Sequence, residues 1–170
     1  MNQEFVIVAV LPEPFARRVK SWHQQFDRWS KSWLPLHVTI IRPLRALSDQ
    51  LRHQAASLVY PLHITWQGWQ TFHNPNANVI WLDPGQDEPR LVTQSLYHDY
   101  PEIRELDSGH YRPGEDHVYH VSVVNHIPDE IVPSIWEQLH LEDCSGECTI
   151  MRLSVFVRNL PAGQWTLMEK

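Results

Sequence analysis

Four residues of the sequence have the types and the spacing that acid–base chemistry at a phosphate requires. His37 stands two positions before Thr39, and His120 stands two positions before Ser122, each pair within an apolar run. Alternation of polar and apolar residues is typical of a half-buried β-strand, in which residues two apart project from the same face. Each imidazole would therefore lie beside a hydroxyl donor. Two such pairs could bind a phosphate and move protons on both sides of it.

A third stretch has the same form, because His63 stands two positions before Thr65 in another apolar run. With 11 His in 170 residues, composition alone gives about one His-x-Ser/Thr, so a single motif of this kind is weak evidence. The chain has three. Which two belong together depends on the elements that carry them.

Those elements are predicted to occur twice in the same order: strand, helix, His strand, helix, strand. We expect strands at 5–11, 37–43, 62–72, 79–82, 119–123, 148–158 and 164–168, and helices at 13–30, 48–60, 88–98 and 129–139. In this alignment His37 and His120 fall on equivalent strands. His63 falls on the strand that corresponds to 148–158, which has no such motif. The repeated order therefore pairs His37 with His120.

Composition and charge exclude several classes of protein. The chain is 42% hydrophobic and 20% charged, as in an ordinary globular domain, and its net charge of −6 disfavours a protein that coats long nucleic acids. No run is long enough to span a membrane, and the first residues lack the features of a signal peptide. Two cysteines, Cys144 and Cys148, favour a reducing cytoplasm over a disulfide scaffold, and with His140 they make only a weak metal motif.

The paired motifs resemble those of the two-histidine phosphoesterases, which include bacterial RNA 2′,3′-cyclic phosphodiesterases, also called 2′-5′ RNA ligases. The separation of the two His, 120 − 37 = 83 residues, and the doubled element order are similar to theirs over nearly the whole chain. The resemblance implies an α+β fold with two antiparallel sheets, helices on the outer faces and a groove at a pseudo-two-fold axis. It implies one domain, 1–170, with repeats at 1–73 and 78–170 whose strands could be exchanged between lobes.

The resemblance also implies what the motif residues do. His37 and His120 would be general base and general acid for hydrolysis of a cyclic phosphodiester, a 2′,3′-cyclic nucleotide or RNA end, without metal or cofactor. Thr39 and Ser122 would bind the phosphate oxygens, and Ser122 replaces a Thr that is common in the family. We expect a cytoplasmic monomer that binds no membrane.

Further substrate contacts are expected at His63, Tyr111, Arg152 and Arg158. A His packed in the sheet is the simpler interpretation of His63. Tyr111 belongs to the polar stretch 101–117, which is either a lid over the groove or a surface loop. Arg152 and Arg158 alternate along the strand predicted at 148–158, on a face that is either groove or solvent.

Three other functions remain open at this point. The protein could join RNA ends as a 2′-5′ ligase, or it could bind nucleotides or RNA ends without turnover. Retention of both His and both hydroxyls argues against binding alone. It could also be a metallohydrolase, although no Asp/Glu/His grouping typical of a two-metal site accompanies either motif.

Overall fold

A computed structural model describes residues 3–27, 34–74, 78–106, 117–161 and 163–168. The elements in chain order are β1 (Gln3–Val10), α1 (Phe15–Phe26), β2 (His37–Leu44), α2 (Asp49–Gln54), the 3-10 turn η1 (Ala55–Ser57), β3 (Leu62–Thr65), β4 (Gly68–Phe72), β5 (Asn78–Asp83), α3 (Asp87–Asp99), α4 (Pro101–Leu106), β6 (Val121–Ile127), α5 (Val132–Leu139), β7 (Glu147–Ile150), β8 (Ser154–Asn159) and β9 (Thr166–Leu167). Within these residues no helix is long and apolar enough to cross a bilayer.

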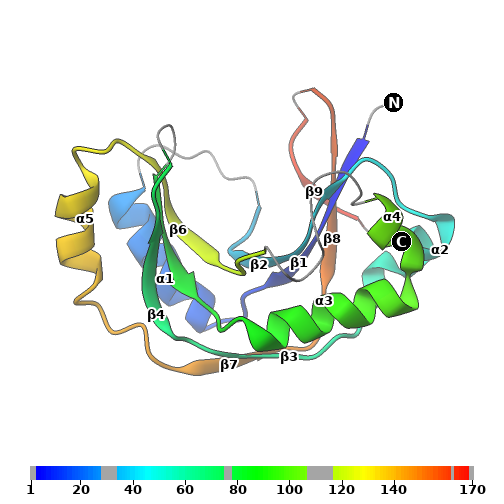
Figure 1. Cartoon of the computed structure of the whole chain (residues 1–170), viewed down its shortest axis with the longest axis horizontal. Coiled ribbons are helices and arrows are strands. Elements are labelled where there is room, and N and C mark those ends of the chain that lie inside the picture. The colour runs from blue at the N-terminus through cyan, green and yellow to red at the C-terminus, as the bar shows by residue number, and fades with distance from the viewer. Residues whose placement is uncertain (1–2, 28–33, 75–77, 107–116, 162, 169–170) are drawn as a thin grey trace.

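The strands form two larger antiparallel sheets and a two-stranded ribbon. One sheet has the order β2-β1-β8-β9, the other has the order β4-β5-β6, and β3 pairs with β7. The order β2-β1-β8 corresponds to β6-β5-β4, because each sheet combines a His strand, the first strand of the same half, and a strand from the other half of the chain. Figure 1 shows the two sheets rising as separate walls above the β3-β7 ribbon. The predicted α+β class with antiparallel sheets is confirmed. The division into repeats at 1–73 and 78–170 stays a prediction.

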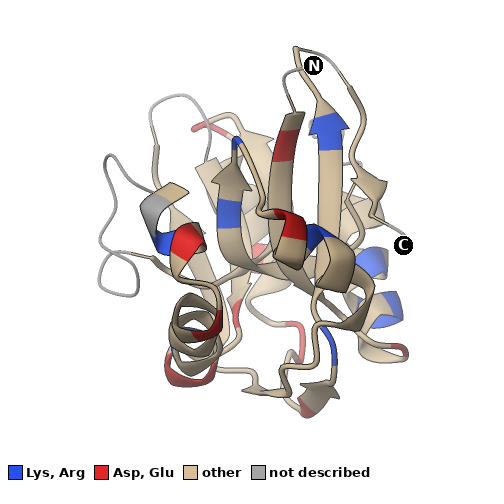
Figure 2. Ribbon diagram, turned by 90° about the vertical axis from the view of Figure 1, so that its right-hand side faces the viewer, with Lys and Arg blue, Asp and Glu red and all other residues tan. Residues whose placement is uncertain are grey.

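The two longest helices pack against strands of these sheets and of the ribbon. Helix α1 packs against β6, whereas α3 packs against β2 and β3. Trp22 and Phe26 of α1 are buried in the main core, together with Leu96 of α3. Both helices have the apolar spacing of an amphipathic helix, which explains why their approximate positions could be predicted. Figure 2 shows Lys and Arg interspersed with Asp and Glu over the elements on one side of the molecule.

Strand β1 is buried on both faces, and this positions the first His strand. Ile7 and Ala9 belong to the main core, whereas Val6 and Val8 pack in a second cluster with Phe156. The register places Thr39 opposite Val8 and His37 opposite Val10. Residues directly opposite in an antiparallel pair share a face. His37 and Thr39 therefore lie on the Val8 face of the sheet, away from the main core.

Two of the predicted strands are in fact pairs of shorter strands. The strand predicted at 62–72 is divided into β3 and β4, which lie in different sheets, and the strand predicted at 148–158 is divided into β7 and β8. Gly68, with φ of 121°, begins β4. Such a positive φ is accessible to Gly but not to most residues, and it lets the chain change sheets. The third strand of each half thus contributes both to the ribbon and to one wall.

The expectations for two other segments also need correction. The segment 101–117, expected to be irregular, contains helix α4. Helix α2 begins close to the predicted position, and the Ser48 side chain caps it by accepting a hydrogen bond from Leu51 N at 3.2 Å. The helix predicted at 129–139 begins only at Val132, and the Asp129 carboxylate accepts a hydrogen bond from Asn78 Nδ2.

Candidate active site

A cleft of about 520 Å³ brings the two predicted motifs together. His37 and Thr39 reach the cleft from β2. Ser122 reaches it from β6, and His120 reaches it from the position just before that strand. The remaining lining residues described are Val10, Leu11, Glu13, Ala16, Lys20, His23, Leu34, Pro35, Leu36 and Asn125. Residues 83 positions apart in the sequence (120 − 37) thus share one cavity.

Each of the two imidazoles is held in the same way by the segment that leads into its strand. His37 Nδ1 lies 2.6 Å from Pro35 O, and His120 Nδ1 lies 2.9 Å from Val118 O. A carbonyl oxygen can only accept, so in both rings Nδ1 carries the proton and donates it. The other ring nitrogen, Nε2, is therefore the unprotonated one when the ring is neutral. It makes no hydrogen bond to any residue that the structure describes. Backbone contacts of this kind set both tautomer and ring direction.

Burial lowers the pKa of both rings. Desolvation is the main cause for His37, where the hydrogen bond to Pro35 opposes the shift and the charge of His120 adds to it. Desolvation also lowers the pKa of His120, against the opposing effect of the Val118 carbonyl. His120 packs edge-on against the rings of Phe72 and Trp81, at centroid distances of 5.0 and 5.8 Å. These aromatic neighbours supply part of its apolar environment.

The two hydroxyls lie beside the imidazoles and have no hydrogen-bond partner among the residues that the structure describes. Thr39 shares a strand face with His37, as Ser122 does with His120, because each pair is separated by two positions. Neither side-chain oxygen forms a hydrogen bond to a described residue. Both hydroxyls are therefore available to donate to an anion in the cleft.

Hydrogen bonds connect the backbone of one motif to the segment that carries the other. His117 Nε2 donates to Thr39 O at 3.2 Å. The Tyr119 hydroxyl, which is fully buried, donates to Thr93 Oγ1 at 2.8 Å. Thr93 Oγ1 in turn lies 3.3 Å from Ile40 O and 3.0 Å from Pro89 O. The residues next to Thr39 and next to His120 are thus tied to each other across the sheets.

The structure places three of the other predicted contacts outside the described residues that line the cleft. His63 is on β3, outside the residues that line the cleft, and its Nδ1 lies 2.9 Å from Thr149 Oγ1 of the paired strand β7. Arg152 is exposed in the break between β7 and β8. Arg152 is therefore not on a strand. The alternation of polar and apolar residues predicted one continuous strand at 148–158, but the strand is interrupted at this position.

Arg158 lies on the same sheet face as the cleft but at a distance from it. It stands opposite Glu4, four residues along β1 from Val8, which corresponds to about 13 Å. Its guanidinium donates to Glu4 Oε2 from Nε and Nη2, at 2.8 and 2.5 Å, and lies over the Trp165 ring. A structural ion pair therefore occupies Arg158. Tyr111 lies outside the described residues.

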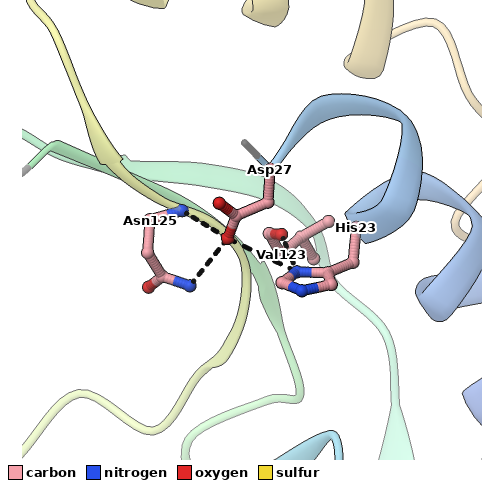
Figure 3. Close-up of polar contacts among 4 residues, drawn as sticks. All are labelled: His23, Asp27, Val123 and Asn125. Atoms are coloured by element: carbon pink, nitrogen blue, oxygen red, sulfur yellow. Dashed lines mark hydrogen bonds and ion pairs between the residues drawn. The ribbon is translucent and has the colours of Figure 1, made fainter. Parts of the chain in front are cut away.

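The sequence interpretation missed a group that helix α1 and strand β6 bring to the cleft. Lys20 and His23 of α1 line it, and so does Asn125 of β6. Figure 3 shows the His23 ring beside Asp27, with Asn125 on the other side of that carboxylate. The signal that could have found the helix residues is their three-residue spacing, which puts both on one side of α1.

Comparison of the sequence with models of protein families identifies the family of this chain. The model of the 2′-5′ RNA ligase superfamily matches residues 11–161. The chain belongs to the 2′-5′ RNA ligase superfamily. The predicted resemblance to two-histidine phosphoesterases is thereby confirmed. No curated protein sequence matches significantly.

Several solved structures have a similar fold over nearly the whole chain. Escherichia coli LigT in its apo form is 13% identical, with a TM-score of 0.62 over 99% of this chain and 95% of LigT. LigT complexed with 3′-AMP is 10% identical, also with a TM-score of 0.62, over 99% of this chain and 97% of LigT. Kluyveromyces marxianus Usb1 is 10% identical, with a TM-score of 0.50 over 99% of this chain and 98% of Usb1. At these identities the likeness shows the fold.

The described residues contain no group of three or more His, Cys, Asp or Glu side chains arranged to hold a metal ion. Cys144 and Cys148 are free thiols, and burial raises the pKa of each. A raised pKa keeps a thiol protonated, which disfavours it as a metal ligand.

Proposed function

We propose that this superfamily member hydrolyses a cyclic phosphodiester, either a nucleoside 2′,3′-cyclic phosphate or an RNA end that carries one. The observation that supports this best is the cleft shared by His37 and His120, each with its Nδ1 bound to a backbone carbonyl. The two imidazoles have the same tautomer, and each lies beside a hydroxyl that has no partner among the described residues. This arrangement suits a phosphorus atom that water attacks from one side while a ribose oxygen leaves from the other.

The reaction divides between the two rings. A neutral imidazole accepts a proton from water at Nε2 while the water oxygen forms a bond to phosphorus. The bond from phosphorus to one ribose oxygen breaks, and the second imidazole, protonated beforehand, donates its Nε2 proton to that oxygen. The product is an open phosphomonoester, and the two rings end with their protonation states exchanged. Either ring fits either role.

The hydroxyls of Thr39 and Ser122 would stabilise the charge that develops on the non-bridging oxygens. Fixed donors in a partly desolvated cleft stabilise such charge better than water does, because they need no reorganisation. The mechanism assigns no step to a metal. The 3′-AMP named with LigT is the type of product that forms when the bond to the 2′ oxygen breaks.

The experiment is a turnover assay with adenosine 2′,3′-cyclic phosphate, in the presence and absence of EDTA, with the product identified by chromatography. We expect a nucleoside monophosphate to form at the same rate in both. Activity that is lost with EDTA and restored by a divalent cation would instead indicate a metallohydrolase. Nucleotide binding without any turnover would indicate a binding module.

Ligation of RNA ends is the second candidate, and the family match supports it. The same pair of rings would then activate the 5′-hydroxyl of a second RNA in place of water. The bond from phosphorus to the 3′ oxygen would break and the second imidazole would protonate that oxygen, so that phosphorus stays on the 2′ oxygen in the new linkage. Addition of a 5′-hydroxyl oligonucleotide to the assay distinguishes the two reactions. A 2′-5′-linked product would support ligation, and an unchanged yield of monophosphate would support hydrolysis.

A further inference from the structure

One side of helix α1 forms part of the cleft wall. Ala16, Lys20 and His23 all line the cleft, and their spacings of four and three residues place them in one row along the helix. Asp27, directly after the helix, continues the row. The proposed acid–base reaction uses none of these side chains.

His23 is held in a fixed orientation by contacts to β6. Its Nδ1 donates to Val123 O at 2.8 Å and lies 3.4 Å from Asp27 Oδ2. Both acceptors lie on the Nδ1 side of the ring, as Figure 3 shows. Nε2 is therefore the ring nitrogen left for a ligand in the cleft, and it has no hydrogen bond to any described residue.

The carboxylate that orients His23 is itself fixed. The Asp27 side chain has no exposed surface. It accepts hydrogen bonds from Asn125 N at 3.2 Å and from Asn125 Nδ2 at 3.4 Å. A buried carboxylate needs such partners. The result is an ordered chain, Asn125–Asp27–His23, that ends at an imidazole on the cleft wall.

Lys20 adds a cation to the same wall. It precedes His23 by three positions, is exposed, and forms no ion pair with any residue that the structure describes. No other Lys or Arg is among the described residues that line the cleft. Glu13 is the nearby carboxylate, and its ion pair with Arg17, at 3.5 Å, partly neutralises it. The protonated His23 ring donates from Nε2 as well as from Nδ1, and together with the Lys20 ammonium it fits an anion with several oxygens.

The position of this row relative to the motif residues suggests what the anion belongs to. Val123, whose carbonyl binds His23, is the residue after Ser122 on β6. On β6, the contact with His23 therefore lies one residue beyond Ser122, which we expect to bind the reacting phosphate. We infer that Lys20 and His23 form a subsite for a second phosphate of the substrate, adjacent to the cyclic phosphate. This inference rests on the proposed hydrolysis and narrows its substrate class to compounds with two phosphate groups.

The second phosphate could be a 5′-monoester or the diester of a preceding nucleotide, and three substrates separate these sources. They are adenosine 2′,3′-cyclic phosphate, its 5′-phosphorylated form, and an adenosine dinucleotide that ends in a 2′,3′-cyclic phosphate. We expect the wild type to prefer at least one of the last two by about tenfold in kcat/KM, the value of one good charge-assisted contact. The preferred compound identifies the source.

Substitutions of Lys20 and His23 test whether this substrate preference comes from the α1 side chains that line the cleft. Lys20→Met and His23→Gln should each reduce the preference to about threefold or less, mainly through KM. Arg104→Met and His53→Gln are matched controls, since both residues are exposed and outside the cleft, and they should keep the wild-type preference. A preference that survives in both α1 variants, or that the wild type lacks, would overturn the subsite.

A binding measurement keeps this test independent of turnover. Titration calorimetry at 0.15 M salt would compare adenosine 3′-monophosphate with adenosine 3′,5′-bisphosphate and with a dinucleotide that ends in a 3′-phosphate. We expect the wild type to bind one of the two larger ligands about tenfold more tightly, and Lys20→Met to remove the difference. Equal affinities in the wild type would refute the subsite. If this difference is found but no cyclic phosphate is hydrolysed, the proposed reaction fails while the subsite stands.

Discussion

His37 and His120 present their rings to one cleft in the same orientation, each with Nδ1 bound to the carbonyl oxygen two residues earlier. The equivalence arises from local chain geometry, since in both cases the acceptor belongs to the segment that leads into the His strand. Because the carbonyl fixes the tautomer, both Nε2 atoms are prepared for the same chemistry. Which ring acts as the base is then decided by protonation and not by orientation.

Replacement of either ring should remove proton transfer. His37→Ala and His120→Ala should each lower kcat by about 10²–10⁴-fold, the usual contribution of a positioned acid or base. KM should change less, because proton transfer is an interaction of the transition state. The double variant should be little slower than the slower single variant, since residues that act as a unit are not additive. Steady-state kinetics on adenosine 2′,3′-cyclic phosphate measures all three.

His63→Ala is the matched control for this series. His63 has the same local sequence, but its ring contacts Thr149 on the β3-β7 ribbon. Its removal should leave kcat within about threefold of wild type and cost about 1 kcal/mol of stability or less. Loss of turnover in His63→Ala, with activity retained in His37→Ala, would contradict the pairing of the two motifs.

The pairing of the two motifs could be predicted from the sequence. Periodicity alone could not show that the third predicted strand of each half is divided into two strands. The alternation of His63, Thr65 and Gln67 with apolar residues continues through the position where β3 ends. Periodicity reports which face a residue occupies and not which sheet its strand joins. Gly68 was the available signal. Continuous strands made His63 and Arg152 candidate substrate contacts, whereas neither is among the described residues that line the cleft.

His23 was missed for a different physical reason. A single His among the polar positions of an amphipathic helix is indistinguishable from an ordinary surface residue. The role of His23 depends on its contacts with Asp27 and, through Asp27, with Asn125. Asp27 and Asn125 are 98 residues apart in the sequence. Contacts of this range depend on how α1 packs against β6, which no local pattern specifies. The strand motifs, by contrast, carry their signal within three residues.

The pH dependence follows from the lowered pKa of both rings. In the free enzyme one ring must be neutral and the other protonated, so kcat/KM should follow a bell-shaped curve. Because burial lowers both pKa values from about 6.5, the maximum should lie on the acid side of pH 6.5. A bound phosphate anion favours the protonated acid, so the basic limb of kcat should lie at higher pH than that of kcat/KM. Initial rates between pH 4.5 and 9 would test this, and a maximum of kcat/KM above pH 8 would contradict it.

Stability should depend on the same groups with a defined sign. His37, His117 and His120 all have a pKa below the ordinary value of about 6.5 for histidine, mainly through desolvation. Below that pH the unfolded chain binds more protons than the folded chain, so the free energy of unfolding decreases as the pH falls. Thermal melts between pH 7.5 and 5 should show a falling Tm, with a smaller decrease for His120→Gln. The exposed His53→Gln should show the wild-type decrease, and an equal decrease in all three proteins would contradict the assignment.

The two hydroxyls should each contribute less than the rings. Thr39→Ala and Ser122→Ala should lower kcat by about 10–10³-fold, at or below the loss of one oxyanion donor, because the other hydroxyl remains. Ser122→Thr keeps the donor and should retain most of the activity. If Ser122→Thr is as slow as Ser122→Ala, the effect would come from packing against β5 and not from the hydroxyl.

Tyr119 should act on turnover through the position of His120, since its buried hydroxyl reaches Thr93 and, through it, the carbonyl of Ile40. Tyr119→Phe should lower the free energy of unfolding by about 1–3 kcal/mol, because Thr93 loses a buried partner. It should also lower kcat with little change in KM, since a displaced acid or base weakens the transition state more than substrate binding. Tyr60→Phe is the matched control, because it removes the hydrogen bond to Asp99 outside the cleft and should leave kcat unchanged. Equal kcat in the two variants would mean that the Tyr119 hydroxyl stabilises the fold without positioning the site.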